Sequence, residues 1–157
     1  MGLPIPIALL RPEIPHNTGA IGRLCVDLAC PLHLIRPLGF ALTSSWVKRA
    51  GLDYWPHLDL HLHDNWEAFL ESVRPTRLFF ASTRGRRSLY DCAFAAGDTL
   101  VFVNVSAGLP EEFYTRYCDD LFRIPMPGPH ARSLNLANAA SVAAYEALRQ
   151  LQSCKSC

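Results

Sequence analysis

The sequence predicts a single α/β domain in which helices cover both faces of a mostly parallel sheet. Two observations support this fold class. Short apolar runs alternate with helical patterns along the chain, and such alternation is typical of βαβ units. A chain of 157 residues, of which 50% are hydrophobic, is also long enough to bury one sizeable core. Only 18% of the residues are charged and no tract is repetitive, which excludes a largely disordered chain.

Three pairs of a strand and a helix are expected in the first half of the chain. In order, strand and helix are expected at 6–12 and 17–29, at 32–38 and 44–51, and at 58–63 and 65–73. In the third strand, leucines alternate with the polar residues His57, Asp59, His61 and His63. We therefore expect an ordinary strand with one polar, hydrated face, and no metal site.

The second half of the chain is expected to end in a long apolar helix. Before it, strands are expected at 77–83, 99–106 and 122–126, with a helix at 110–117. From Leu136 to Ala144 only Asn138 and Ser141 are polar, so the apolar surface of this last helix runs nearly all the way round. Such a helix needs partners on more than one side.

Four loops at the expected carboxyl edge of the sheet are rich in Gly, Pro and short polar residues. Ligands of open α/β sheets bind beyond the carboxyl ends of the strands, and loops of this composition suit a ligand held by backbone groups. The four loops are 12–19, 83–88, 105–110 and 127–133. The chain lacks the GxGxxG, P-loop and GxSxG patterns, which disfavours a Rossmann dinucleotide site, an NTPase and an α/β-hydrolase.

Two of these loops contain polar residues that precede a helix. Asn17 is expected to be the N-cap of the first helix, and Ser133 that of the last helix, with Asn135 close to the free N–H groups of the helix terminus. Arg23 is expected in an apolar setting, where an unpaired guanidinium is costly. It therefore needs an anion, and a phosphate or a carboxylate fits the fork of its side chain.

Three segments in this order resemble the three motifs of the SPOUT-class RNA ribose methyltransferases. They are PEIPHNTGAIGRLC at 12–25, LVFVNVSAGLP at 100–110 and IPMPGPHARSLNLANAASVAAYEA at 124–147. The segment GFALTSSWVKRAGLDYW at 39–55 is similar to the TrmL-like branch of that class, and the resemblance spans residues 7–152. This branch 2′-O-methylates the wobble nucleotide of tRNA, a cytidine or modified uridine, with S-adenosylmethionine.

The resemblance implies a fold with a C-terminal trefoil knot and a homodimer whose active site lies between the subunits. It implies a methyltransferase domain at 1–152 and a short tail at 153–157. It further implies that S-adenosylmethionine is held mainly by main-chain groups of loops after three strands. Carried onto this chain, the cofactor-binding positions are Ala81, Val103, Ile124 and Ser133, with Gly108 shaping the second loop.

The resemblance also implies roles for the polar residues of the first and third motifs. Arg23 acts on the ribose, Asn17 holds its loop, and Ser133 and Asn135 frame the site. A guanidinium rarely gives up its proton, so we expect Arg23 to bind the adjacent phosphate and stabilise the developing alkoxide rather than act as a base.

The second motif departs from that of the relatives. They carry Gly and Glu where this chain has Val103 and Val105, and a valine at the first position is expected to crowd the cofactor. Two alternatives therefore stay open: a catalytically impaired RNA-binding dimer, and a flavodoxin-like nucleotide binder without RNA. The target of an active enzyme could also be another RNA, such as rRNA.

RNA binding is expected from local basic patches, because the net charge is only +1. The candidate residues are Arg84, Arg86, Arg87, Lys48 and Arg49. The N-terminal segment has neither the features of a signal peptide nor those of a membrane anchor, so a cytoplasmic protein with reduced thiols is expected. The CxxC at Cys154 and Cys157 is interpreted as part of a tail rather than a metal or redox site.

Overall fold

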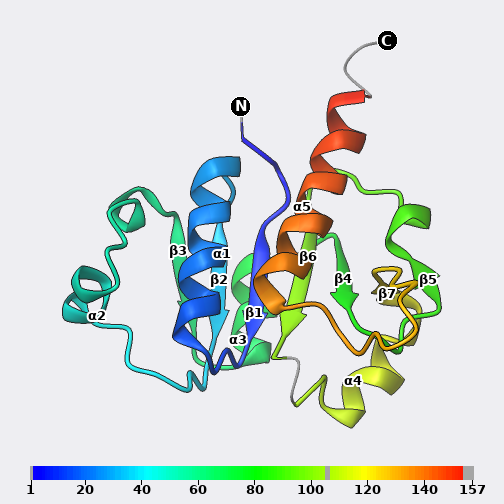
Figure 1. Cartoon of the computed structure of the whole chain (residues 1–157), viewed down its shortest axis with the longest axis horizontal. Coiled ribbons are helices and arrows are strands. Elements are labelled where there is room, and N and C mark those ends of the chain that lie inside the picture. Colours follow the sequence, from blue (N-terminus) through cyan, green and yellow to red (C-terminus); the bar gives the residue numbers. More distant parts are fainter. Residues whose placement is uncertain (1, 105–106, 154–157) are drawn as a thin grey trace.

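Seven parallel strands form one sheet in the computed structural model, which describes residues 2–104 and 107–153. The strand order is β3-β2-β1-β6-β4-β7-β5 (Figure 1). The bounds are β1 Ile7–Leu10, β2 Leu32–Ile35, β3 Leu60–His63, β4 Arg77–Ala81, β5 Arg87–Ser88, β6 Asp98–Val103 and β7 Leu121–Arg123. Each strand pairing is parallel, as predicted, so the carboxyl ends of the strands lie along one edge.

Helices cover both faces of this sheet, which confirms the predicted fold class. The α-helices are α1 Pro15–Leu28, α2 Ser44–Arg49, α3 Trp66–Val73, α4 Glu111–Arg116 and α5 Leu136–Ser153. Short 3₁₀ helices η1 Trp55–His57, η2 Leu89–Asp91 and η3 Cys118–Asp120 lie between them. Each face has its own apolar core. One core packs under α1 and α5, and the other under α3 and α4.

The central strands contribute to both cores because side chains alternate between the faces of a strand. Ile7 and Leu9 of β1 belong to the core under α1 and α5, whereas Ala8 and Leu10 belong to the other core. All four are buried. A strand buried on both faces is apolar throughout, which is why the first strand was visible as a continuous apolar run.

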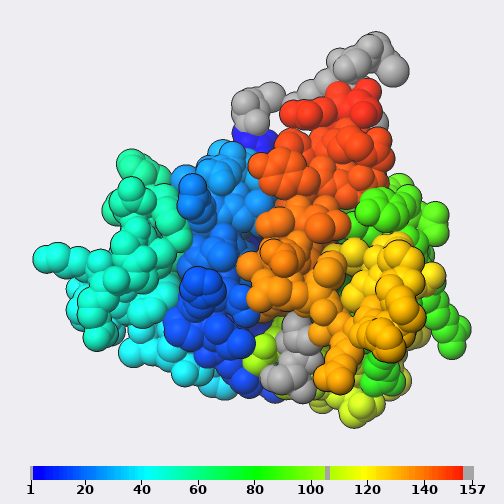
Figure 2. Space-filling view, in the orientation of Figure 1, coloured from blue at the N-terminus to red at the C-terminus, as the bar shows by residue number. Residues whose placement is uncertain are grey.

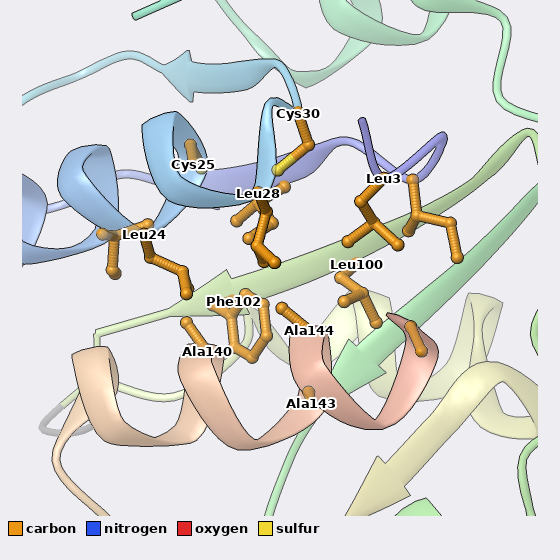
Figure 3. Packing of buried hydrophobic residues seen from close by; sticks show 14 of the residues in the cluster. Leu3, Leu24, Cys25, Leu28, Cys30, Leu100, Phe102, Ala140, Ala143 and Ala144 are labelled. Atoms are coloured by element: carbon orange, nitrogen blue, oxygen red, sulfur yellow. The ribbon is translucent and has the colours of Figure 1, made fainter. Parts of the chain in front are cut away.

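The long helix α5 packs closely against α1 and the sheet through its alanines. Figure 3 shows Ala140 and Ala144 of α5 on the side of the helix that faces Leu24 of α1 and Phe102 of β6. The opposite side of α5 leaves Val142 and Tyr145 exposed, with 51% of Tyr145 accessible. The core of this chain therefore covers one side of α5, as expected, and the side with Val142 and Tyr145 is exposed.

Both predicted N-caps are wrong. Helix α1 begins two residues before Asn17, at Pro15, because proline is well suited to a position whose N–H would have no helical partner. Asn17 is therefore buried inside the first turn. Helix α5 begins at Leu136, and Asn135 rather than Ser133 caps it: the Asn135 Oδ1 accepts hydrogen bonds from the N–H groups of Ala137 and Asn138 at 2.9 and 3.3 Å.

The prediction of a hydrated histidine face on β3 is also wrong in part. His61 is exposed, but His63 is buried, and its Nε2 lies 2.9 Å from Nδ1 of the buried His33 on β2. Leu62, expected in the core, is exposed. The reason is that β3 is an edge strand whose histidine side is covered by Phe69 of α3, which no alternation pattern could reveal.

Candidate functional site

A cavity of about 230 Å³ lies at the carboxyl edge of the sheet, beyond β4, β6 and β7. Its wall comes from the segments after these three strands and from the first turns of α5. The lining residues are Ala81, Ser82, Thr83, Phe102, Val103, Asn104, Gly108, Leu109, Tyr114, Ile124, Met126, Arg132, Ser133, Leu134, Leu136 and Ala139. The wall combines apolar side chains with main-chain and hydroxyl groups, which suits a small organic ligand with a few polar atoms.

The structure brings all five predicted cofactor-binding residues to this one cavity. Ala81, Val103, Gly108, Ile124 and Ser133 line it, although they are up to 52 positions apart in the sequence. The parallel arrangement explains this, since strands that are distant in the chain end at the same edge. Val105, the other departure in the second motif, lies outside the described residues.

Gly108 shapes the wall because its backbone adopts a conformation that other residues avoid. Its φ is +65°, and a Cβ at this position would lie 3.2 Å from the hydroxyl of Tyr114. The same hydroxyl accepts a hydrogen bond from the Leu109 N–H at 3.3 Å. A side chain at position 108 would therefore strain the turn and push against Tyr114.

Tyr114 lines the cavity and Arg84 stacks on its ring, an arrangement that sequence reasoning did not find. The guanidinium carbon of Arg84 lies 3.6 Å from the centre of the Tyr114 ring, and its Nη1 lies 3.3 Å from a carboxylate oxygen of Glu111. These contacts connect the segment after β4 to α4. Tyr114 had no signal beyond its place in a helical pattern, and Arg84 was predicted to contact RNA rather than to stack on the wall of the cavity.

Asn17 of the first motif and Asn135 of the third motif are in contact. The Asn135 Nδ2 donates a hydrogen bond to the Asn17 Oδ1 at 3.1 Å. Asn135 thereby caps α5 and connects its first turn to the first turn of α1. Both residues lie beside the cavity and neither of them lines it.

Arg23 is exposed, so the prediction of an apolar setting is wrong. Successive residues of a helix are rotated by about 100°. Ile21, Leu24 and Cys25 therefore face the core, whereas Arg23 faces the solvent. Within residues 2–104 and 107–153, the guanidinium of Arg23 makes no hydrogen bond or ion pair, and Arg23 does not line the cavity of its own chain. It is available to an external anion.

A carboxylate lies next to the cavity at the end of β6. The Asn104 Nδ2 donates a hydrogen bond to Glu13 Oε2 at 2.6 Å, which connects the end of β6 to the segment after β1. Asn104 itself lines the cavity. The sequence placed Glu13 in the correct loop but gave no sign of this partner.

The five basic residues predicted to contact RNA form two separate groups. Lys48 and Arg49 end α2, which lies beyond the β3 edge of the sheet, whereas Arg87 lies on β5 at the other edge (Figure 1). Arg84 and Arg86 precede β5. All five side chains are exposed. One protomer therefore does not present them as a single patch.

The described ranges contain neither a metal site nor a membrane-spanning helix. Among residues 2–104 and 107–153, no group of three or more His, Cys, Asp or Glu side chains has an arrangement that could hold a metal ion. None of the helices in these ranges is long and apolar enough to cross a membrane.

The fold and the cavity together define an α/β protein with a small-molecule site at the carboxyl edge of a parallel sheet. Residues 4–145 match the model of the SpoU rRNA Methylase family, and the chain belongs to this family. The match covers the strands, the cavity and most of α5.

Individual relatives agree with this assignment. A protein of Aeromonas hydrophila named tRNA (cytidine(34)-2'-O)-methyltransferase is 49% identical over 148 residues, which cover 94% of each chain. A solved structure described as "Structural insights into the 2-OH methylation of C/U34 on tRNA" is 54% identical, covers 95% of this chain and 97% of its own, and has a TM-score of 0.86. The SpoU methyltransferase AviRb from Streptomyces viridochromogenes, solved in complex with AdoMet, is 26% identical, with a TM-score of 0.80 and coverage of 95% and 61%.

Proposed function

We propose that this chain transfers the methyl group of S-adenosylmethionine to the 2′-oxygen of the wobble nucleotide of tRNA, a cytidine or modified uridine at position 34. The observation that carries the proposal is that all five predicted cofactor positions surround one cavity in a chain that is 49% identical to a tRNA (cytidine(34)-2'-O)-methyltransferase over nearly its full length. A tRNA-modifying enzyme acts where tRNA is present, and a cytoplasmic location is part of the proposal.

The residues around the cavity fit S-adenosylmethionine. This cofactor supplies an electrophilic methyl group on a positively charged sulfur. The apolar side chains of Leu109, Ile124 and Ala139 suit an adenine ring, and the main chain near Ala81 and Gly108 approaches the cavity without a bulky side chain in between. None of the lining residues in the described ranges is acidic, so main-chain carbonyls and hydroxyls would be the acceptors for the polar groups of the ligand.

Arg23 is the residue best suited to hold the RNA. Its guanidinium is exposed and makes no hydrogen bond or ion pair within the described ranges, so it can form a bidentate contact with a phosphate. By binding the phosphate beside the target ribose, Arg23 would orient the 2′-hydroxyl toward the methyl group and stabilise negative charge on its oxygen.

A homodimer with a shared active site is part of the proposal. Arg23 does not line the cavity of its own chain, and Arg23 of a second copy would complete the site in the homodimer. Figure 2 shows α1 and α5 side by side on one surface of the molecule. Val142 and Tyr145 of α5 and Ile14, which precedes α1, are large apolar residues with exposed side chains. An apolar surface of this kind is typical of the interface between subunits.

The proposal is tested by transfer of a labelled methyl group to total tRNA and, separately, to rRNA, followed by mapping of the modified nucleotide. We expect label on the ribose of nucleotide 34 of tRNA. Label on rRNA alone would mean that rRNA is the substrate instead of tRNA, and no label on either RNA would contradict the activity.

The variant Arg23→Lys keeps the charge but loses the fork of the guanidinium, and we expect it to lower kcat at least about tenfold without changing cofactor affinity. Near-normal methylation by this variant would contradict the role of Arg23.

A second candidate function is an RNA-binding dimer that has lost catalysis, and Val103 is the observation that favours it. Val103 lines the cavity at a position where the second motif of relatives has glycine. Calorimetry with S-adenosylmethionine separates the two functions, because an enzyme must bind the cofactor whereas the impaired dimer would bind only RNA.

A further inference from the structure

The segment between α2 and β3 is seated on the first half of α1. The hydroxyl of Tyr54 donates a hydrogen bond to the main-chain oxygen of Gly19 at 2.8 Å. Next to it, Trp55 fits against Gly22 so closely that a Cβ at position 22 would lie 2.6 Å from Cζ3 of the tryptophan. Gly22 thus makes room for Trp55, whereas a Cβ at Gly19 would be in ordinary contact with Leu52 and the Tyr54 hydroxyl at 3.5 and 3.9 Å.

Arg23 lies beside Tyr54 as a consequence of helix geometry. The Gly19 oxygen that accepts the Tyr54 hydroxyl is also the oxygen to which the Arg23 N–H is directed, four residues later in the helix. Side chains of a helix lean toward its N-terminus, so the side chain of Arg23 is directed toward the turn that contains Gly19, where Leu52 and the Tyr54 hydroxyl lie 3.5 and 3.9 Å from the position of a Cβ. The Tyr54 ring occupies the space next to that path.

Electrostatics agrees with this placement. Burial raises the pKa of the Tyr54 hydroxyl, and the positive charge of Arg23 acts on the same pKa in the opposite direction. Such an effect requires the guanidinium to be near the phenol. The guanidinium of Arg23 therefore has an aromatic neighbour, although it forms no hydrogen bond or ion pair within the described ranges.

We propose that Tyr54 is a positioning residue for Arg23. Held in place by its hydrogen bond to Gly19, the ring restricts the rotamers of the guanidinium and directs it toward the ribose and phosphate of the substrate. The proposal rests on the function and the role of Arg23 proposed above. It adds a residue from the GLDYW stretch at 51–55 to the reaction.

The test removes only the hydroxyl of Tyr54, in the variant Tyr54→Phe. Tyr90→Phe is the matched control, because Tyr90 lies on η2 with 60% of its surface exposed. In the first measurement, nuclear magnetic resonance relaxation of the Arg23 Nε–H reports the order of this side chain without RNA. We expect an ordered side chain in the wild type, a clear loss of order in Tyr54→Phe, and no change in Tyr90→Phe. An Arg23 side chain that is equally mobile in all three proteins would overturn the proposal.

The second measurement is a double-mutant cycle of Tyr54→Phe with Arg23→Lys on kcat. We expect Tyr54→Phe to lower kcat about tenfold with unchanged cofactor affinity, and to have almost no further effect once Arg23 is lysine. Additive effects would overturn positioning through Arg23 while leaving the methyltransferase function intact. A protein that orders Arg23 through Tyr54 but transfers no methyl group would support the contact and refute the proposed function, so the two failures are distinguishable.

Discussion

Single residues at the cavity decide how well this chain can hold a cofactor, and Val103 is the clearest case. The side chain of Val103 is half-buried at the end of β6 and lines the cavity between Phe102 and Asn104. Gly108 on the same wall shows the opposite solution, a position where any Cβ would meet Tyr114. The two residues set the space available after β6.

Replacing Val103 by glycine should tighten binding of S-adenosylmethionine. The change removes the atoms that narrow the cavity, and we expect the dissociation constant to fall about three- to tenfold, a gain on the order of 1 kcal/mol. Isothermal calorimetry measures it, with Val103→Ala as an intermediate step. Equal or weaker binding by the glycine variant would mean that the valine does not crowd the ligand. Because glycine weakens a strand, the melting temperature is the control for folding.

The histidine pair at His33 and His63 should make stability depend on pH. Burial, with the nearby His61 and His63, lowers the pKa of His33 to about 4 from an ordinary 6.5, although Asp59 acts in the opposite direction. The pKa in the folded state lies below that of the unfolded chain. Its stabilising contribution is therefore complete above pH 6.5 and is lost as the pH falls toward 4.

We expect the free energy of unfolding to be about 2 kcal/mol lower at pH 5 than at pH 7.5 because of His33 alone. Urea unfolding at a series of pH values measures the effect. The variant His33→Gln lacks the titrating group, and its stability should vary less over this range. An identical pH dependence in both proteins would show that His33 does not titrate differently on folding.

At the scale of elements, one amide side chain joins the first turns of α1 and α5. Asn135 accepts from the first turn of α5 and donates to Asn17 of α1, so a single residue serves both helices. The first turn of α5 also lines the cavity through Leu136 and Ala139. The shape of the cavity therefore depends on where α5 begins.

The variant Asn135→Ala should destabilise the protein by about 2 kcal/mol. It removes the cap, worth about 1 kcal/mol, and leaves the buried Asn17 oxygen without its donor. Urea unfolding gives the value. Ser133→Ala is the control, because Ser133 is exposed and does not cap α5, and we expect a change below about 0.5 kcal/mol. The reverse order of the two costs would restore Ser133 as the cap.

For the whole molecule, local patterns predicted the order of the long elements and the loops at the carboxyl edge, because an apolar run followed by a turn-rich loop is visible without tertiary contacts. The five predicted residues that line the cavity came from the family resemblance and not from local patterns. The two-residue strand β5 was too short for any periodicity, and the caps of α1 and α5 depended on a proline and on an amide pair across 118 positions. Whether His63 is buried depended on which strand lies at the edge. The trefoil knot stays a prediction.

The proposed homodimer uses the outer surface of α5. In the variant Tyr145→Glu, a charge would be buried at the proposed subunit interface, and we expect single chains and loss of methyl transfer. Analytical ultracentrifugation measures the mass. Leu62→Glu is the matched control, since Leu62 is 41% exposed on the edge strand β3 and should not affect association. A wild-type protein that sediments as a single chain would contradict the homodimer.

The packing of α5 couples ligand binding in the cavity to the stability of the core. Since α5 both packs against the sheet and lines the cavity, a molecule that settles against Leu136 and Ala139 also braces the longest helix of the chain. A cofactor concentration one hundred times the dissociation constant stabilises the folded state by about 2.7 kcal/mol. Proteolysis and amide exchange along α5 should therefore slow as cofactor accumulates, so that the supply of methyl donor sets the lifetime of the folded protein.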